Sequence, residues 1–235
     1  MNGKSVTQLD QEKQLAARSA LEWVKSGMRL GLGSGSTAYH FIRFLGEKVQ
    51  QGQIKVEAIA ASRASETLAR QFQIPLLDPE RGLRLDLAVD GADEIGPGLS
   101  LIKGGGGALL REKVIARAAD QFLVIADSSK RVSQLGAFPL PVEVIGFAVP
   151  WVMDELARLG SKTALRMGAG SSAYLTDQQN NILDCNFGVI ADPQALAAKL
   201  EAIPGIAEHG LFLNYAHAAL IGSDGDVALV RRDSR

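Results

Sequence analysis

Three short polar segments in the first half of the chain combine glycines with side chains that could bind an anion or move a proton. They read GLGSGST (Gly31 to Thr37), DGADE (Asp90 to Glu94) and KGGGGALLREK (Lys103 to Lys113). Glycine lets backbone N–H groups come close to an anionic ligand, and the Asp, Glu and Lys side chains supply groups for acid–base catalysis. Together the segments indicate a phosphorylated metabolite and proton transfer.

The first segment can hold an anion through loop amides and the hydroxyls of Ser34, Ser36 and Thr37. The alternative is an ordinary turn in which Ser36 is the N-cap of the next helix. Three glycines and three hydroxyls exceed what a turn requires, so the pattern favours binding. It is neither a dinucleotide fingerprint, because Ser36 stands where the third glycine is expected, nor a Walker loop, because no G-K-[ST] follows.

The second segment places Asp90, Asp93 and Glu94 within five residues at the end of an apolar run. Crowded carboxylates repel one another, so one of them could have a raised pKa and act as an acid or base. A solvated turn or a divalent-cation site built from oxygens would use the same residues. The motif by itself leaves these alternatives open.

The third segment has four glycines that lead into a helix, with Lys103 before them, and could form an oxyanion-binding turn. In that helix Leu110, Val114 and Ala118 form one apolar stripe, and Glu112 falls on the opposite side. The pattern therefore predicts that Glu112 faces solvent.

Apolar runs and helical spacing predict alternating strands and helices up to about residue 126. Because this alternation is typical of a mostly parallel sheet covered on both faces, we expect a Rossmann-like α/β fold, with ligands beyond the carboxyl ends of the strands. The three polar segments should then meet at one sheet edge, in a shared cleft. The expected strands are 28–32, 54–60, 74–77, 85–89 and 122–126, and the expected helices are 7–25, 36–49, 64–71 and 108–119.

The pattern of expected strands and helices changes near Gly136, where a compact α+β unit begins. We expect strands near 138–145 and 163–167, helices at 150–159 and 193–202, and a hairpin-like pair at 174–176 and 181–185. The last stretch, AALIGSDGDVALVRR, predicts two strands about a turn at 223–225 that rejoin the first sheet. The predicted domains are a Rossmann-like domain, 1–135 with 210–235, and a smaller inserted α+β domain, 136–209.

Composition narrows the class of partner. The 235 residues are 46% hydrophobic and 22% charged, a composition typical of a globular protein. The formal net charge is −1, so the protein as a whole has no positive potential that would attract nucleic acid or an anionic membrane. No membrane span or secretory signal is visible, so the cytoplasm is expected. Cys185 is the only cysteine, which excludes an intrachain disulfide and predicts a buried small hydrophobe. The three histidines lack metal-ligand spacing, and both tryptophans, Trp23 and Trp151, sit in helical patterns and are expected to be packing residues.

Taken in order, the segments GSGST, VDGADEI, KGGGGALLREK, IADSSK and FPLPVEVI closely resemble the ribose-5-phosphate isomerase type A family. The resemblance extends over nearly the whole chain. It implies interconversion of D-ribose 5-phosphate and D-ribulose 5-phosphate in the pentose phosphate pathway, through an enediolate and without a metal or organic cofactor. It also implies a cytoplasmic homodimer or homotetramer whose partner is a small sugar phosphate.

The resemblance also assigns roles to residues. It implies that Glu112 is the general base, which reverses the interpretation from helix periodicity. Asp90 would assist ring opening, Asp93 would orient hydroxyls, and Lys103 would stabilise the enediolate. The substrate-binding residues it implies are Ser34, Gly35, Ser36, Thr37, Asp90, Gly91, Ala92, Asp93, Lys103, Gly104, Gly105, Gly106 and Lys130.

Three positions depart from the family pattern: Ser34 stands where threonine is common, Gly107 where alanine is common, and His217 where many relatives have aspartate. Two other classes share a related sheet architecture, namely sugar-phosphate-sensing regulatory domains and coenzyme A transferases. Binding of ribose 5-phosphate without ketose formation would favour the first class, and exchange with acyl-CoA the second.

Overall fold

The computed structural model describes residues 4–232, and these form two compact units. Unit 1 comprises 4–92, Arg111–Arg131 and 214–232, and unit 2 comprises Asp93–Leu110 and Val132–Leu213. Unit 2 thus takes in the whole of the predicted inserted domain and, in addition, 93–110, 132–135 and 210–213. The domain boundaries given above stay a prediction.

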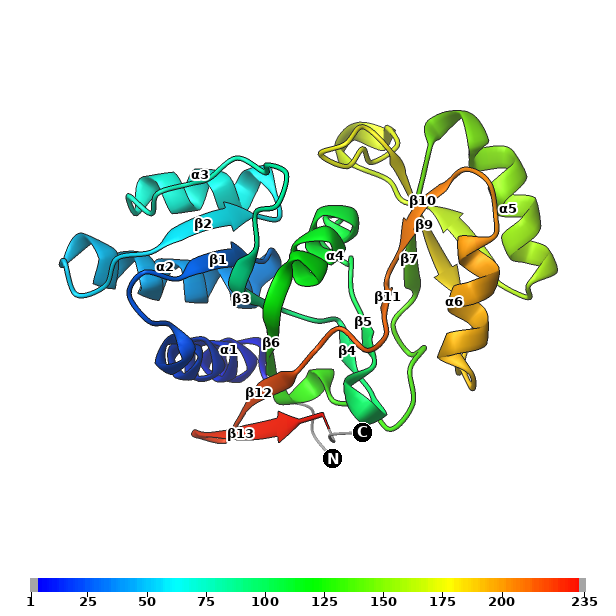
Figure 1. Ribbon diagram of the computed structural model, residues 1–235. Helices are drawn as coiled ribbons and strands as arrows, with labels where there is room; N and C mark the ends of the chain where they lie inside the picture. The colour runs from blue at the N-terminus through cyan, green and yellow to red at the C-terminus, as the bar shows by residue number, and fades with distance from the viewer. Residues whose placement is uncertain (1–3, 233–235) are drawn as a thin grey trace. The chain divides into compact units, whose positions relative to one another are not determined.

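Unit 1 is built on one six-stranded sheet with strand order β13-β12-β6-β3-β1-β2 (Figure 1). All neighbouring strands are parallel except β13, which returns antiparallel to β12. The predicted return of the last two strands to the first sheet is confirmed. The strands are β1 (Arg29–Leu32), β2 (Glu57–Ala60), β3 (Leu85–Asp90), β6 (Ala119–Asp127), β12 (Ala218–Ser223) and β13 (Asp226–Arg231).

The helices of unit 1 begin at recognisable signals. Ser5 accepts a hydrogen bond from the Gln8 amide while the Gln8 side chain accepts from the Ser5 amide, which is a capping box, and Ser62 caps the third helix through Ser65. The helices are α1 (Val6–Ala20), α2 (Gly35–Gln50), α3 (Arg63–Gln71) and α4 (Leu109–Ala118), with 3₁₀ turns η1 (Leu21–Trp23) and η3 (Ser128–Lys130).

Helices cover both faces of this sheet. Alternate strand residues such as Leu30 and Leu32 share one buried cluster with residues of α1 and α2. Gly31, between them, faces the other way, and a Cβ atom on it would lie 2.4 Å from Ile115 of α4. Alpha-helix α4 therefore packs tightly on the opposite face, and the predicted Rossmann-like architecture is confirmed.

Unit 2 contains two antiparallel sheets. A four-stranded sheet has the order β10-β7-β9-β8, and a three-stranded sheet has the order β11-β5-β4. The strands are β4 (Glu94–Ile95), β5 (Leu101–Ile102), β7 (Leu140–Val144), β8 (Lys162–Leu165), β9 (Asn181–Asn186), β10 (Ile206–His209) and β11 (Leu211–Phe212). The helical elements are α5 (Val149–Arg158), α6 (Pro193–Glu201), η2 (Pro97–Leu99), η4 (Gly146–Ala148) and η5 (Ala169–Ser171).

Several local predictions were wrong. Residues 74–77 and 174–176 form no strand, and each segment contributes only an isolated bridge, from Leu76 and Leu175. Trp151 is 60% exposed and lies beside Phe147 on the outside of α5, so it is not an interior residue. Periodicity alone does not show which side of a short helix meets the core. Cys185 is buried as predicted, and burial raises its pKa to about 12, which keeps the thiol protonated.

Within residues 4–232, no helix has both the length and the apolar character that crossing a membrane requires. The same residues contain no group of three or more His, Cys, Asp and Glu side chains placed to hold a metal ion.

Candidate active site

Unit 1 brings the first polar segment together with Asp90, which begins the second segment, as predicted. Strands β1, β3 and β6 are parallel neighbours, so Gly33, Asp90 and Asp127 lie at the same sheet edge. The third segment does not follow a strand of this sheet. Lys103 comes after β5, which belongs to the three-stranded sheet of unit 2. The expectation that all three segments leave one sheet was therefore wrong, because the two-residue strand β5 carries too little pattern to assign its partner.

Asp90 organises the loop after β1. Its Oδ1 accepts hydrogen bonds from the Ser34 amide at 2.9 Å and the Gly91 amide at 2.7 Å, and the residue is 4% exposed. A Cβ atom on Gly33 would lie 2.1 Å from the Asp90 Cγ, so the close approach of loop and carboxylate requires glycine there. Gly33 also donates its amide to the Val89 carbonyl at 2.9 Å.

Glu112 lies in the first turn of α4 and is 5% exposed, contrary to the prediction from periodicity. Val114, from the predicted apolar stripe, is 61% exposed. The buried side of α4 contains Ile115, which contacts β1 near Gly31, and Glu112 is three residues earlier on the same side. The Ser34 hydroxyl donates a short hydrogen bond to the Glu112 Oε1.

This arrangement places a buried carboxylate next to a glycine- and hydroxyl-containing loop. A buried carboxylate that is held by one hydroxyl at a defined point can take a proton from a substrate carbon or return one. Because the Ser34 hydroxyl turns toward Glu112, Ser34 is the N-cap residue of α2 without capping it through its side chain. The alternative in which Ser36 caps this helix was wrong.

The first turn of α2 faces the same loop. Gly35 and Ser36 are exposed, whereas Thr37 is 8% exposed. The first amides of a 16-residue helix have no partner within the helix, and they lie at the positive end of its dipole. This turn can therefore bind an anionic group such as a phosphate.

Two further residues singled out in the sequence also lie in unit 1. Lys130 ends the 3₁₀ turn after β6 and is half-buried. His217 accepts a hydrogen bond from the Phe122 amide at its Nδ1, 3.0 Å away, and its own amide donates to the Phe122 carbonyl. Burial, with a contribution from Arg232, lowers the pKa of His217. Through these two hydrogen bonds His217 holds the beginning of β12 against β6.

Unit 2 contains the glycine turn that follows Lys103. Lys103 is 3% exposed, and its Nζ lies 5.4 Å from the centroid of the Phe212 ring, a cation–π contact. The Asp93 Oδ2 accepts a hydrogen bond from the Gly105 amide at 2.8 Å. A Cβ atom on Gly105 would lie 2.5 Å from the Asp93 Oδ1, so the turn and this carboxylate fit only because the residue is glycine.

Two residues that sequence reasoning missed contact the same turn, and a third holds one of them in place. Arg166 donates through Nη1 to the carbonyl oxygens of Gly104 and Gly105, Asp184 pairs with Arg166, and the Tyr174 hydroxyl donates to the Gly106 carbonyl at 3.3 Å. They lie sixty or more residues after the turn, and neither spacing nor motif links them to it. Only the register of β8 against β9, which pairs Ala164 with Asp184, explains why Arg166 meets Asp184.

The family model described as ribose 5-phosphate isomerase A (phosphoriboisomerase A) matches residues 57–226. A protein named ribose-5-phosphate isomerase A from Roseiflexus castenholzii is 50% identical over 220 residues, covering 92% of this chain and 94% of that protein. Its namesake from Parvibaculum lavamentivorans is 47% identical over 221 residues, covering 92% of this chain and 95% of that protein.

Solved structures give the same result. A D-ribose-5-phosphate isomerase in complex with phospho-erythronic acid superposes with a TM-score of 0.92 at 37% identity, covering 99% of this chain and 100% of that one. Ribose 5-phosphate isomerase A from Methanocaldococcus jannaschii superposes with a TM-score of 0.90 at 38% identity, covering 94% of this chain and 99% of that one.

Proposed function

The chain belongs to the ribose 5-phosphate isomerase A family, and we propose that Glu112 is the base of the reaction by which it interconverts D-ribose 5-phosphate and D-ribulose 5-phosphate in the pentose phosphate pathway. The observation that carries this proposal is the buried position of Glu112 against the hydroxyl of Ser34. The Ser34 hydrogen bond fixes the carboxylate at the loop that follows β1.

The chemistry needs one well-placed base. Converting the aldose to the ketose takes a proton from C2, gives a proton to C1 and moves a hydroxyl proton from O2 to O1. A single carboxylate on one face of the open-chain sugar can make both transfers at carbon through an enediolate. Glu112 takes the proton from C2 and returns it to C1.

Charge develops on the sugar oxygens in the enediolate, and unit 2 supplies groups that could bind it. Lys103 carries a buried positive charge, and the amides of the turn Gly104, Gly105 and Gly106 are hydrogen-bond donors. Asp93 orients substrate hydroxyls, and Asp90, with Gly91 and Ala92 beside it, assists opening of the furanose ring. Preorganised donors of this kind stabilise developing negative charge without reorganising during the reaction.

The phosphate binds at the first turn of α2. Gly35, Ser36 and Thr37 supply amides, and Ser36 and Thr37 add hydroxyls at the positive end of the helix dipole. Lys130 is a second candidate for this contact. The resemblance to the family further supports a homodimer or homotetramer that acts in the cytoplasm.

The test compares Glu112→Gln with the wild type in EDTA. We expect kcat for ribulose 5-phosphate formation to fall about 10²–10⁴-fold, since positioned proton transfer contributes about that factor. Affinity for phospho-erythronic acid, measured by calorimetry, should change little, because the amide keeps the shape of the side chain. Glu22→Gln, an exposed glutamate of η1, is the matched control and should keep full activity. Near-normal turnover of Glu112→Gln would refute the assignment.

An isotope experiment tests the single-base mechanism. Ribose 5-phosphate deuterated at C2 should yield ribulose 5-phosphate with part of the deuterium at C1, because the same carboxylate removes and returns it. Complete loss of deuterium from the first product formed would contradict return of the proton by a shielded Glu112.

A further inference from the structure

The Arg166 side chain holds the glycine turn of unit 2 by its carbonyl oxygens. The guanidinium Nη1 donates to the Gly104 and Gly105 oxygens at 3.0 Å each. Its Nε donates to the Asp184 Oδ2 at 3.0 Å, and its Nη2 donates to the Asp184 Oδ1. Asp184 thus fixes the plane of the guanidinium, and the guanidinium fixes the turn.

The peptide between Gly104 and Gly105 transmits this constraint to Asp93. A trans peptide is planar, with its C=O and N–H pointing in opposite directions. The C=O of this peptide accepts from Arg166, and its N–H donates to the Asp93 Oδ2 at 2.8 Å. Hydrogen bonds therefore run in one line from Asp184 through Arg166 and the peptide to Asp93, and such chains polarise one another.

The next peptide is held in the same way. The Gly105 carbonyl accepts from Arg166, so the Gly106 N–H points away from the guanidinium. Tyr174 completes the arrangement, with its hydroxyl on the Gly106 carbonyl and its ring centroid 5.8 Å from the Arg166 Cζ. Burial raises the pKa of Tyr174, so the phenol remains a donor at neutral pH.

We infer that Arg166, held by Asp184, is a positioning residue for the isomerisation: it sets the orientation of Asp93 and the side on which the glycine turn presents its amides. The inference rests on the roles proposed above for Asp93 and the turn. A lysine would not replace it, because an ammonium group lacks the planar fork that bonds two carbonyls and a carboxylate at once.

The test combines truncation with chemical rescue. Arg166→Ala should lower kcat about 10²-fold, the scale expected when reacting groups are misplaced by about 1 Å. KM should change less, because the phosphate contacts are proposed for α2. Guanidinium ion at a non-denaturing concentration should restore part of kcat, and methylammonium should not. Arg166→Lys keeps the charge and is the variant to measure if Arg166→Ala does not fold; it should lose kcat similarly.

Two comparisons make the result specific. Arg158→Ala removes an arginine from an exposed ion pair with Glu155 in the same unit, and it should neither lose activity nor respond to guanidinium. Asp93→Asn combined with Arg166→Ala should lose little more than the worse single variant, since both act through one hydrogen-bonded chain.

Full kcat in a folded Arg166→Ala or Arg166→Lys protein would overturn the inference, whatever Glu112→Gln does. Losses that multiply in the double variant would overturn the link to Asp93. A loss in Glu112→Gln alone would leave the proposed function standing while this inference fails.

Discussion

The two units hold their polar loops with groups of opposite charge. In unit 1, the Asp90 carboxylate accepts from the amides of Ser34 and Gly91. In unit 2, the Arg166 guanidinium donates to two carbonyls of the glycine turn. A carboxylate at the centre of a loop accepts hydrogen bonds from the loop amides, which are then not available to a ligand. A guanidinium instead donates to the loop carbonyls, so the amides point away from the guanidinium.

This difference assigns different tasks to the two loops. The amides of Ser34 and Gly91 already donate to Asp90, so an anion at unit 1 must use amides further into α2, such as those of Ser36 and Thr37. In unit 2, the Gly106 amide lies on the side away from Arg166, where it can meet a sugar oxygen. We therefore expect unit 1 to supply the base and the phosphate contacts, and unit 2 to stabilise the enediolate.

The largest effect is expected when the carboxylate at the centre of the unit 1 loop is removed. Asp90→Ala leaves two amides without their acceptor, at about 1–3 kcal/mol each, and also removes the group proposed for ring opening. We expect kcat to fall about 10²–10⁴-fold together with a lowered unfolding temperature. Asp90→Asn keeps an acceptor oxygen, so it should fold like the wild type and still lose kcat. Wild-type kcat in Asp90→Asn would show that Asp90 only holds the loop.

The next variant, Gly107→Ala, changes the unit 2 turn and leaves Arg166 unsubstituted. Gly107 has φ +80°, and a Cβ atom there would lie 2.3 Å from the Tyr174 hydroxyl oxygen. Gly107→Ala should therefore lower stability by about 1–3 kcal/mol from overpacking and lower kcat by up to about 10²-fold as the turn shifts. Circular dichroism melts and initial rates measure both effects.

A second substitution separates crowding from backbone strain. Tyr174→Ala in the Gly107→Ala background removes the clash and should restore part of the stability and kcat. Gly160 has a positive φ and no neighbour within 4 Å, so Gly160→Ala carries strain without a clash and is the matched control. Failure of Tyr174→Ala to restore anything would mean that backbone strain, not the tyrosine, requires glycine at position 107.

The sequence predicted most of unit 1 because its elements are long and locally encoded. The alternation of strands and helices and the two returning strands both follow from patterns within a few residues. The same local reasoning placed the loops after β1 and β3 at one edge, since parallel neighbours end together. It failed for Glu112, because periodicity cannot tell which side of α4 packs on the sheet when both sides are partly buried.

Local sequence patterns could not predict the contacts that hold the glycine turn of unit 2. Arg166 meets the glycine turn across 62 residues of sequence, Asp184 meets Arg166 through the register of β8 against β9, and the turn follows a strand of only two residues. Family resemblance supplied the roles of Lys103 and Glu112, but it gave no reason for glycine at position 107. The structure supplies that reason in Tyr174.

A smaller effect is expected where unit 1 binds the phosphate. Thr37→Ala removes one hydroxyl from the first turn of α2, and a hydrogen bond to a charged group contributes about 1.5–3 kcal/mol. KM for ribose 5-phosphate should rise about tenfold or more with kcat nearly unchanged, and Thr37→Ser should recover much of it. Thr67→Ala, on the exposed side of α3, is the control. An unchanged KM in Thr37→Ala would move the phosphate contact to Lys130.

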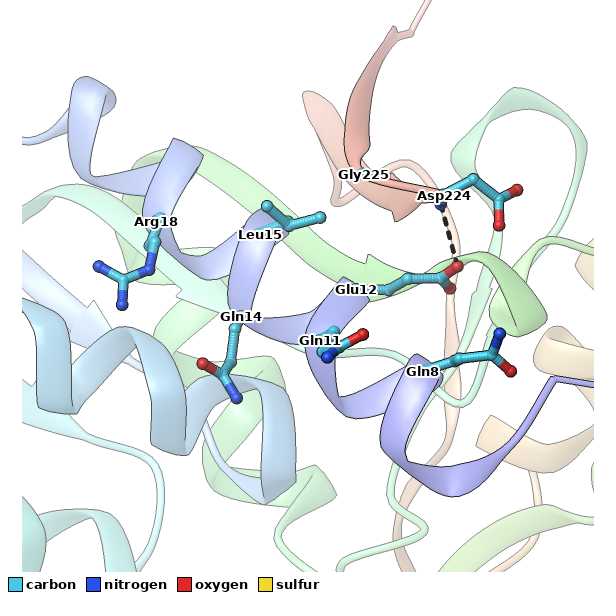
Figure 2. Close-up of a pocket in the computed structure, with 8 residues that line it drawn as sticks. All are labelled: Gln8, Gln11, Glu12, Gln14, Leu15, Arg18, Asp224 and Gly225. Atoms are coloured by element: carbon cyan, nitrogen blue, oxygen red, sulfur yellow. Dashed lines mark hydrogen bonds between the residues drawn. The ribbon is translucent and has the colours of Figure 1, made fainter.

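The smallest effect on activity is expected at a third buried carboxylate. Glu12 is 3% exposed and lies beside a surface depression lined by polar residues of α1 and by Asp224 and Gly225 (Figure 2). It accepts from Lys4, from the amide and hydroxyl of Ser128, and from the Asp224 amide at 3.2 Å. Like Asp90, it gathers donors from separate segments, but none of these donors belongs to the loop after β1 or to α4, where Glu112 lies.

Glu12 should therefore affect stability in acid and leave catalysis unchanged. Burial opposes its ionisation, yet the donors from Lys4, Ser128 and Asp224 prevail and lower its pKa from 4.5 to about 2. A carboxyl whose pKa is lower in the folded state stabilises the fold above pH 4.5 and loses that contribution as the pH falls toward 2. The free energy of unfolding should fall more steeply over this window in the wild type than in Glu12→Gln, with Glu22→Gln matching the wild type. Parallel curves would show that these donors stabilise the Glu12 carboxylate no better than water does, and that a carboxylate at the centre of converging segments need not stabilise them.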